Sequence, residues 1–147
     1  MSFLENLVVK LTARVEKQID NLTDKKAFEA AQDANVAKDY KTALKGFEEL
    51  AEKGHVRAAT LAGGMYITGA VVKENGPKAL KYLTIGAEAG DVDAIALLGM
   101  AYAAGKAGVK VDYFKARPLL EQAVKNGDKH ALQMLNMVKA KQKGNKR

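Results

Sequence analysis

Apolar residues recur at spacings of three and four along most of this chain, which is the pattern of amphipathic α-helices. The first run of this kind predicts one helix of about 18 residues, which we assign to residues 1–22. Ser2, followed three residues later by Glu5, is the capping-box pattern that starts such a helix. The apolar positions of the run are Phe3, Leu4, Leu7, Val8, Leu11, Val15, Ile19 and Leu22.

Three interpretations of this N-terminal helix are open. It can cap the open face of the helices that follow it. It can also be a surface for self-association, or a helix that docks on a partner. A membrane-surface helix is disfavoured because the polar side mixes acidic and basic residues. These polar residues are Lys10, Arg14, Glu16, Lys17 and Asp20.

Three later stretches of the chain share a pattern in which an alanine opens the stretch and a glycine closes it eleven positions later. The stretches are residues 43–54, 79–90 and 116–127. Their closing glycines, Gly54, Gly90 and Gly127, are spaced by 36 and 37 residues. Apolar residues four positions apart predict a helix in each stretch. The glycine suits the left-handed residue that ends a helix.

A second motif follows the first two closing glycines at a shift of 36 residues. Each copy places a glycine inside an expected helix, at Gly63 and at Gly99. A glycine there costs about 1 kcal/mol relative to alanine, so we expect both to lie where helices approach closely. Tyr66 and Tyr102 follow three residues later, and we expect their hydroxyls to reach a polar partner. The copies are Ala58, Ala62, Gly63, Tyr66, Gly69 and Ala94, Leu98, Gly99, Tyr102, Gly105.

The segments between these motifs are expected loops, and each one ends in a residue type that starts helices. Asp39, Asn75 and Asp112 all lie four residues before the alanine that opens a stretch. Aspartate and asparagine side chains accept a backbone N–H at helix N-termini. The loops are residues 69–75 and 105–112, and a shorter turn covers residues 37–39.

These motifs resemble the Sel1-like repeat, a relative of the tetratricopeptide repeat, over residues 40–138. The resemblance implies an all-α, right-handed solenoid of antiparallel helix pairs with about eight helices. The repeats are assigned to residues 23–138, and the first pair, residues 24–53, is more similar to an ordinary tetratricopeptide pair. Short chains of this family look bacterial. Relatives that bind penicillin-type ligands carry paired cysteines, and this chain has none, so that activity is not expected here.

The last copy of the second motif departs from the others. It begins at His130-Ala131 but has Asn136 at the glycine position and Lys139 at the tyrosine position. A terminal repeat has one face toward water, so polar residues there are expected of a capping helix.

The formal net charge of +7 is concentrated at the C-terminus. Residues 139–147 hold five basic residues and no acidic one, and the rest of the chain holds 19 basic and 17 acidic residues. We assign residues 139–147 to a basic tail, which is either a solubilising end or an arm for an anionic partner. Aromatic residues do not alternate with the basic ones as a base-stacking platform requires, which disfavours nucleic acid.

Candidate catalytic, cofactor and metal residues are not found, so we expect a non-enzymatic protein without a cofactor. His55 and His130 lack a metal-ligand spacing, and there is no cysteine. Residues 99–107 differ from a phosphate loop in spacing and in their final residue. The longest uncharged run, residues 58–72, is too short to span a bilayer. No signal peptide is evident, and we expect a cytoplasmic location.

The resemblance implies that the first helix of each pair lines a concave groove. Positions two, three and six after its opening alanine are then expected to face the groove. They are small or uncharged, which favours burial of a segment of another protein and predicts an interaction scaffold. Packing inside the array is an equal alternative for Leu61 and Leu97. The predicted groove residues are Thr60, Leu61, Gly64, Ala96, Leu97, Met100, Gln133 and Met137.

Two other functions remain open. The chain can be an enzyme or a small-ligand protein with an unrecognised site. It can also be a nucleic-acid or membrane adaptor that uses the basic tail.

Overall fold

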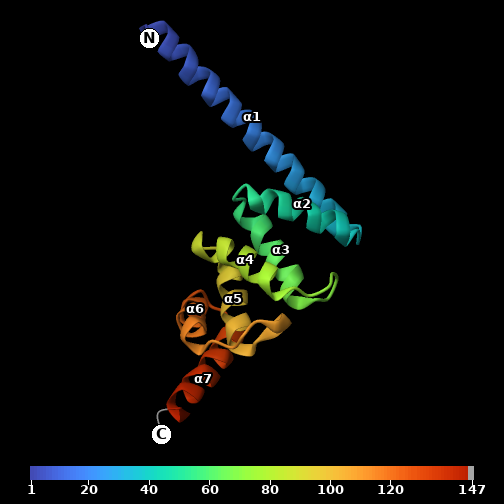
Figure 1. The fold of residues 1–147 in the computed structure, drawn as a ribbon, viewed down its shortest axis with the longest axis vertical. Coiled ribbons are helices and arrows are strands. Elements are labelled where there is room, and N and C mark those ends of the chain that lie inside the picture. Colours follow the sequence, from blue (N-terminus) through green and yellow to red (C-terminus); the bar gives the residue numbers. More distant parts are fainter. Residues whose placement is uncertain (146–147) are drawn as a thin grey trace. The chain divides into compact units, whose positions relative to one another are not determined.

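A computed structural model describes residues 1–145, and every regular element in this part of the chain is helical (Figure 1). The all-α prediction is confirmed, with seven α-helices and one short 3-10 turn in the described residues. The helices are α1 (Phe3–Val36), α2 (Tyr40–Glu52), α3 (Val56–Thr68), α4 (Gly76–Glu88), α5 (Val92–Ala104), η1 (Lys106–Gly108), α6 (Tyr113–Lys125) and α7 (Lys129–Gly144).

The helix count is one lower than expected because α1 continues through the predicted boundary at residue 22. The predicted N-terminal helix and the first helix of the first pair are one element of 34 residues. No glycine or proline interrupts this stretch, so nothing local ends the helix where its apolar stripe ends. The capping box is confirmed, since Ser2 N donates to Glu5 Oε2 at 2.7 Å and Glu5 N donates to Ser2 Oγ at 3.2 Å.

The chain divides into two compact units, and the first comprises residues 1–46. Within it, the end of α1 packs against the start of α2. Ala31 is buried, and a Cβ placed on Gly46 would lie 2.9 Å from the Cβ of Ala31. The predicted turn at residues 37–39 is confirmed, and Lys38 takes the left-handed conformation there.

The second unit begins at Phe47 and contains the array of paired helices. Each helix from α3 to α7 packs on the next one. In addition, α3 contacts α5 and α5 contacts α7, so the first helices of successive pairs form one layer. A surface shared by successive repeats can therefore form on the layer of α3, α5 and α7.

The glycines inside α3 and α5 lie at close helix contacts, as predicted. A Cβ on Gly63 would lie 2.6 Å from Cγ of Leu83 in α4 and 3.0 Å from its backbone nitrogen. A Cβ on Gly99 would lie 3.2 Å from Cγ of Leu120 in α6. Leu83 and Leu120 are both fully buried, so the two glycines make room for equivalent leucines of successive pairs.

The predicted helix ends and starts are also confirmed. The closing glycines Gly54, Gly90 and Gly127 have φ values of +87°, +85° and +91°. Asn75 accepts from the backbone N–H of Lys78 at 3.0 Å. The side chains of Asp39 and Asp112 accept from Thr42 N at 3.2 Å and from Lys115 N at 3.0 Å.

The predicted basic tail does not begin at residue 139, because α7 continues to Gly144. Val138 is fully buried, and Gln142 accepts a hydrogen bond of 3.1 Å from Arg117 of α6. The basic residues up to Lys143 therefore belong to a packed helix, and Lys146 and Arg147 lie outside the described residues. In residues 1–145 no helix has the length and apolar character that a membrane span needs.

Candidate functional site

A groove of about 480 Å³ lies on the layer of first helices, mainly between α3 and α5. Six of the eight predicted groove residues line it, three from each of these helices. The lining residues are Arg57, Thr60, Leu61, Gly64, Met65, Thr68, Ala70, Val71, Asp93, Ala96, Leu97, Met100 and Asp128.

The predicted groove residues differ in how much of their surface is exposed in the groove. Thr60 and Ala96 are buried, with 3% and 6% of their surface exposed, and they form the floor. Leu61, Leu97 and Met100 are half-buried and supply the apolar surface that remains open.

The hydroxyl of Thr60 is used inside the fold. It donates to the carbonyl oxygen of Val56 at 3.2 Å. Thr60 also packs against α4, where a Cβ on Gly86 would lie 2.4 Å from the Thr60 hydroxyl oxygen. The floor of the groove is therefore apolar in effect, although it contains a threonine.

Gln133 and Met137, the two predicted residues of α7, do not line this groove. Gln133 is exposed. Met137 is half-buried against the core that α5, α6 and α7 share, where Leu120 and Leu135 lie. Asp128, the residue that caps the N-terminus of α7, lines the groove instead.

Sequence reasoning missed lining residues for two different reasons. Met65 and Thr68 lie one helical turn after Leu61 and Gly64, so the same periodicity could have found them. Ala70 and Val71 come from the loop after α3, and no helical spacing predicts where that loop runs.

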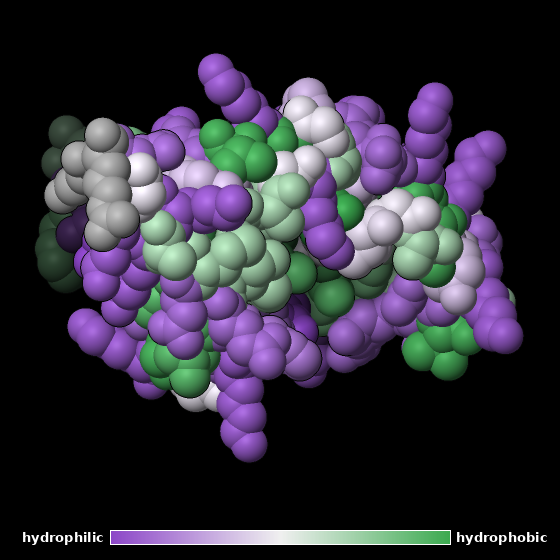
Figure 2. All heavy atoms as spheres, turned by 90° about the horizontal axis from the view of Figure 1, so that it is seen from below, coloured by the Kyte–Doolittle hydropathy of each residue, from purple (hydrophilic) through white to green (hydrophobic). Residues whose placement is uncertain are grey.

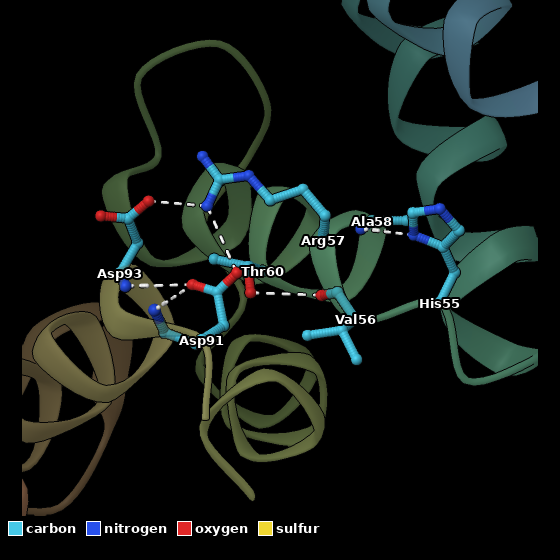
Figure 3. A network of polar contacts seen from close by, with 8 residues as sticks. His55, Val56, Arg57, Ala58, Thr60, Asp91 and Asp93 are labelled. Atoms are coloured by element: carbon cyan, nitrogen blue, oxygen red, sulfur yellow. Dashed lines mark hydrogen bonds and ion pairs between the residues drawn. The ribbon is translucent and has the colours of Figure 1, made fainter. Parts of the chain in front are cut away.

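The polar edge of the groove is held by an arginine and two aspartates (Figure 3). Arg57 Nη1 lies 2.6 Å from Asp93 Oδ2 and 3.3 Å from Asp91 Oδ2. The hydrogen bond to Asp93 is the largest cause that raises the pKa of Arg57 above its usual value, and Asp91 adds to it. Asp91 also caps α5 through the backbone N–H groups of Asp93 and Ala94.

Comparison with known families identifies the units that build this groove. The Sel1 repeat matches twice in succession, at residues 56–91 and 92–128. The chain contains two Sel1 repeats. The first Sel1 repeat holds α3 and α4, the second holds α5 and α6, and the groove lies between their first helices.

Solved structures of Sel1-type proteins share this fold. The chain is 24% identical to c5321, a protective antigen of uropathogenic Escherichia coli strains, with a TM-score of 0.68 over 80% of this chain. It is 28% identical to a Sel1 repeat protein from Oxalobacter formigenes, with a TM-score of 0.65 over 76% of this chain. It is 22% identical to Helicobacter pylori cysteine-rich protein B, with a TM-score of 0.55 over 77% of this chain and 95% of that one.

The length of the chain differs from that of the first two of these proteins. It spans 26% of the Escherichia coli protein and 47% of the Oxalobacter formigenes protein. No curated protein matches the sequence. The likeness therefore gives the fold, and the function must be argued from the groove.

A second polar cluster in the first Sel1 repeat joins it to the end of α2. The rings of Tyr66 and Tyr82 are stacked, with centroids 6.3 Å apart. The Tyr66 hydroxyl donates to Glu48, as the sequence predicted for a polar partner, and the Tyr82 hydroxyl donates to Glu52 at 3.2 Å. Burial, and then the Glu48 hydrogen bond, raise the pKa of Tyr66 to about 12. Every hydroxyl of this cluster is occupied within the fold, so it serves packing.

The surface around the array is mixed in character. In the view from below, hydrophobic side chains reach the surface in the middle of the molecule and at several places along its edge, with hydrophilic side chains between them (Figure 2). Within residues 1–145, no three His, Asp or Glu side chains gather as a metal site needs. The groove itself offers mainly apolar contact, through Leu61, Leu97 and Met100.

Proposed function

We propose that this protein binds an extended segment or a helix of another protein in the groove between α3 and α5. Sel1 repeats generally act as scaffolds for protein–protein interaction. The observation that carries the proposal is that six small or uncharged residues of successive repeats line one groove.

The groove has the features that recognition of an apolar anchor needs. Leu61, Leu97 and Met100 are half-buried, so an inserted side chain would complete their burial. Methionine adapts its shape to different partners. At Gly64 there is no side chain, and a Cβ there would still be 3.6 Å from Leu97, which leaves room for an anchor.

The charges at the polar edge of the groove favour a particular kind of side chain next to the apolar anchor of the bound segment. The single positive charge of Arg57 faces the two negative charges of Asp91 and Asp93, and Asp128 adds a further carboxylate at the groove. We therefore propose a partner segment in which a basic side chain flanks the apolar anchor.

The test is affinity capture from the native host with the wild-type chain and with Met100→Glu, followed by calorimetry on the recovered partner. The substitution puts a carboxylate against the anchor, which would abolish capture if that surface is desolvated in the complex. Leu61→Glu is a second variant, because Met100 also touches the core shared by α5, α6 and α7.

Phe114→Glu is the matched control, since Phe114 is 85% exposed on α6 and does not line the groove. Unchanged partner affinity in both groove variants would contradict the proposal. A double variant Lys141→Gln/Lys143→Gln separates it from an electrostatic adaptor. Affinity that survives the groove variants and is lost in the lysine variant would favour the adaptor.

A further inference from the structure

The first part of α1 exposes a row of large apolar side chains. Each of them has between 42% and 80% of its surface exposed. Such a row on a helix marks an interaction surface more often than scattered single residues do. The exposed residues are Phe3, Leu4, Leu7, Val8, Val9, Leu11, Val15, Ile19 and Leu22.

The lengths of the two helical segments of the first unit explain this exposure. At 1.5 Å per residue, the 34 residues of α1 span about 51 Å, and the part of α2 that lies in this unit, residues 40–46, spans about 10 Å. Ala31, near the end of α1, is the residue that lies against α2 at Gly46. The first 20 residues of the helix thus extend beyond what α2 can cover.

The exposed residues contain a heptad pattern. A core residue recurs at alternating spacings of four and three over residues 4–22, which is almost three heptads. In this register Val8 and Val15 take the a positions, and Leu4 and Leu11 take the d positions. Valine at a with leucine at d favours two-stranded parallel coiled coils. The full core series is Leu4, Val8, Leu11, Val15, Gln18 and Leu22.

We propose that two copies of this chain associate through residues 4–22 as a parallel, in-register coiled coil. A second copy of the chain fits this apolar face, because each core residue of one helix then packs against the same residue of the other helix. Leu7 and Ile19 flank the core at the g and e positions, and their exposed surfaces would be partly covered by the same contact.

Gln18, the polar residue of the core series, favours a parallel over an antiparallel pair of helices. In a parallel pair Gln18 faces Gln18, and the two side-chain amides can hydrogen-bond to each other. In an antiparallel pair with the same core, Gln18 would face Val8, and its amide would be buried without a partner. Gln18 takes a d position here, and a single polar residue at an a position of a coiled-coil core is known to specify register at some cost in stability.

The first test is the mass of the full chain in solution. Sedimentation equilibrium is expected to give twice the chain mass of 15.8 kDa at micromolar concentration. Leu11→Asp is expected to give the monomer, because it places a carboxylate in the centre of the core. Ala13→Asp is the matched control, since position 13 is an f position on the opposite side of the helix, and it should remain a dimer.

The second test uses the absence of cysteine from the chain. Under mild oxidation Gln18→Cys should form a disulfide-linked dimer in a parallel pair, and Ala13→Cys should not. This test decides the proposal even if Leu11→Asp fails to fold.

Several results would overturn the proposal. A monomer at all concentrations does so, as does a dimer that persists in Leu11→Asp. Cross-linking of a Val8→Cys/Gln18→Cys chain but not of Gln18→Cys would show an antiparallel pair. A monomer that binds anionic phospholipid vesicles through residues 3–22 would assign the face to a membrane. The inference is independent of the groove, so Met100→Glu is expected to remain a dimer.

Discussion

Arg57 and Asp93 occupy the same position in the two Sel1 repeats, 36 residues apart, and form an ion pair with 2.6 Å between Nη1 and Oδ2. One repeat position thus carries opposite charges in successive copies. The pair joins α3 to α5 at the polar edge of the groove. It therefore contributes to the spacing of the two helices that form the candidate site.

A double-mutant cycle of Arg57→Gln and Asp93→Asn should give a small favourable coupling, of about 0.2–1 kcal/mol. The two side chains are 48% and 57% exposed, so water and salt screen the pair. Urea unfolding of the four chains measures the coupling. It should fall when salt is added, and a coupling that does not respond to salt would contradict a surface ion pair.

Neighbouring glycines of α3 should respond to alanine with opposite signs. Gly63→Ala should destabilise the fold by about 1–3 kcal/mol, because the new Cβ would overlap the backbone and side chain of Leu83. Gly64→Ala should stabilise it by about 0.5–1 kcal/mol, since the nearest atom is Leu97 Cδ1 at 3.6 Å. Thermal unfolding compares the variants.

The same reasoning applies to the second repeat. Gly99→Leu should also overpack its contact with Leu119 and Leu120, at a cost of about 1–3 kcal/mol. A wild-type melting temperature for Gly99→Leu would contradict the helix register.

His55→Asp should stabilise the array by about 0.5–1 kcal/mol. His55 caps α3 through Nδ1, which accepts from Ala58 N at 3.2 Å. The residues at the same place before α5 and α7 are Asp91 and Asp128, and aspartate is the better cap because its charge also suits the helix N-terminus. Asp128→His is the reverse control and should lower the unfolding free energy.

Stability should fall at high pH through Tyr66. Folding raises its pKa from 10 to about 12, so the phenol stabilises the fold below pH 10 and this contribution is lost as the pH rises toward 12. The absorbance of tyrosinate should show a component that ionises near pH 12. Tyr66→Phe should remove that component, and a titration unchanged by the substitution would contradict the assignment.

The repeat architecture could be read from the sequence because it depends on short-range signals. Gly54 and Asn75 act within one turn of backbone, by adopting a left-handed conformation or by capping an N–H group. The glycines at 63 and 99 also revealed close contacts, since glycine inside a helix needs a compensating gain. The extent of α1 was not predicted, because its apolar stripe ends at Leu22 although its helical backbone continues to Val36.

Only the tertiary structure decided which side chains share the groove. Leu61, Leu97 and Met100 were predicted from the groove that the Sel1-like resemblance implies, but a position in the repeat cannot show that Met137 packs against the core. Nor can it show that the loop at Val71 reaches the groove. Helical periodicity defines the face of one helix, whereas the groove depends on how far neighbouring helices are offset and on where a loop crosses them. Those distances are set by packing between residues far apart in the chain.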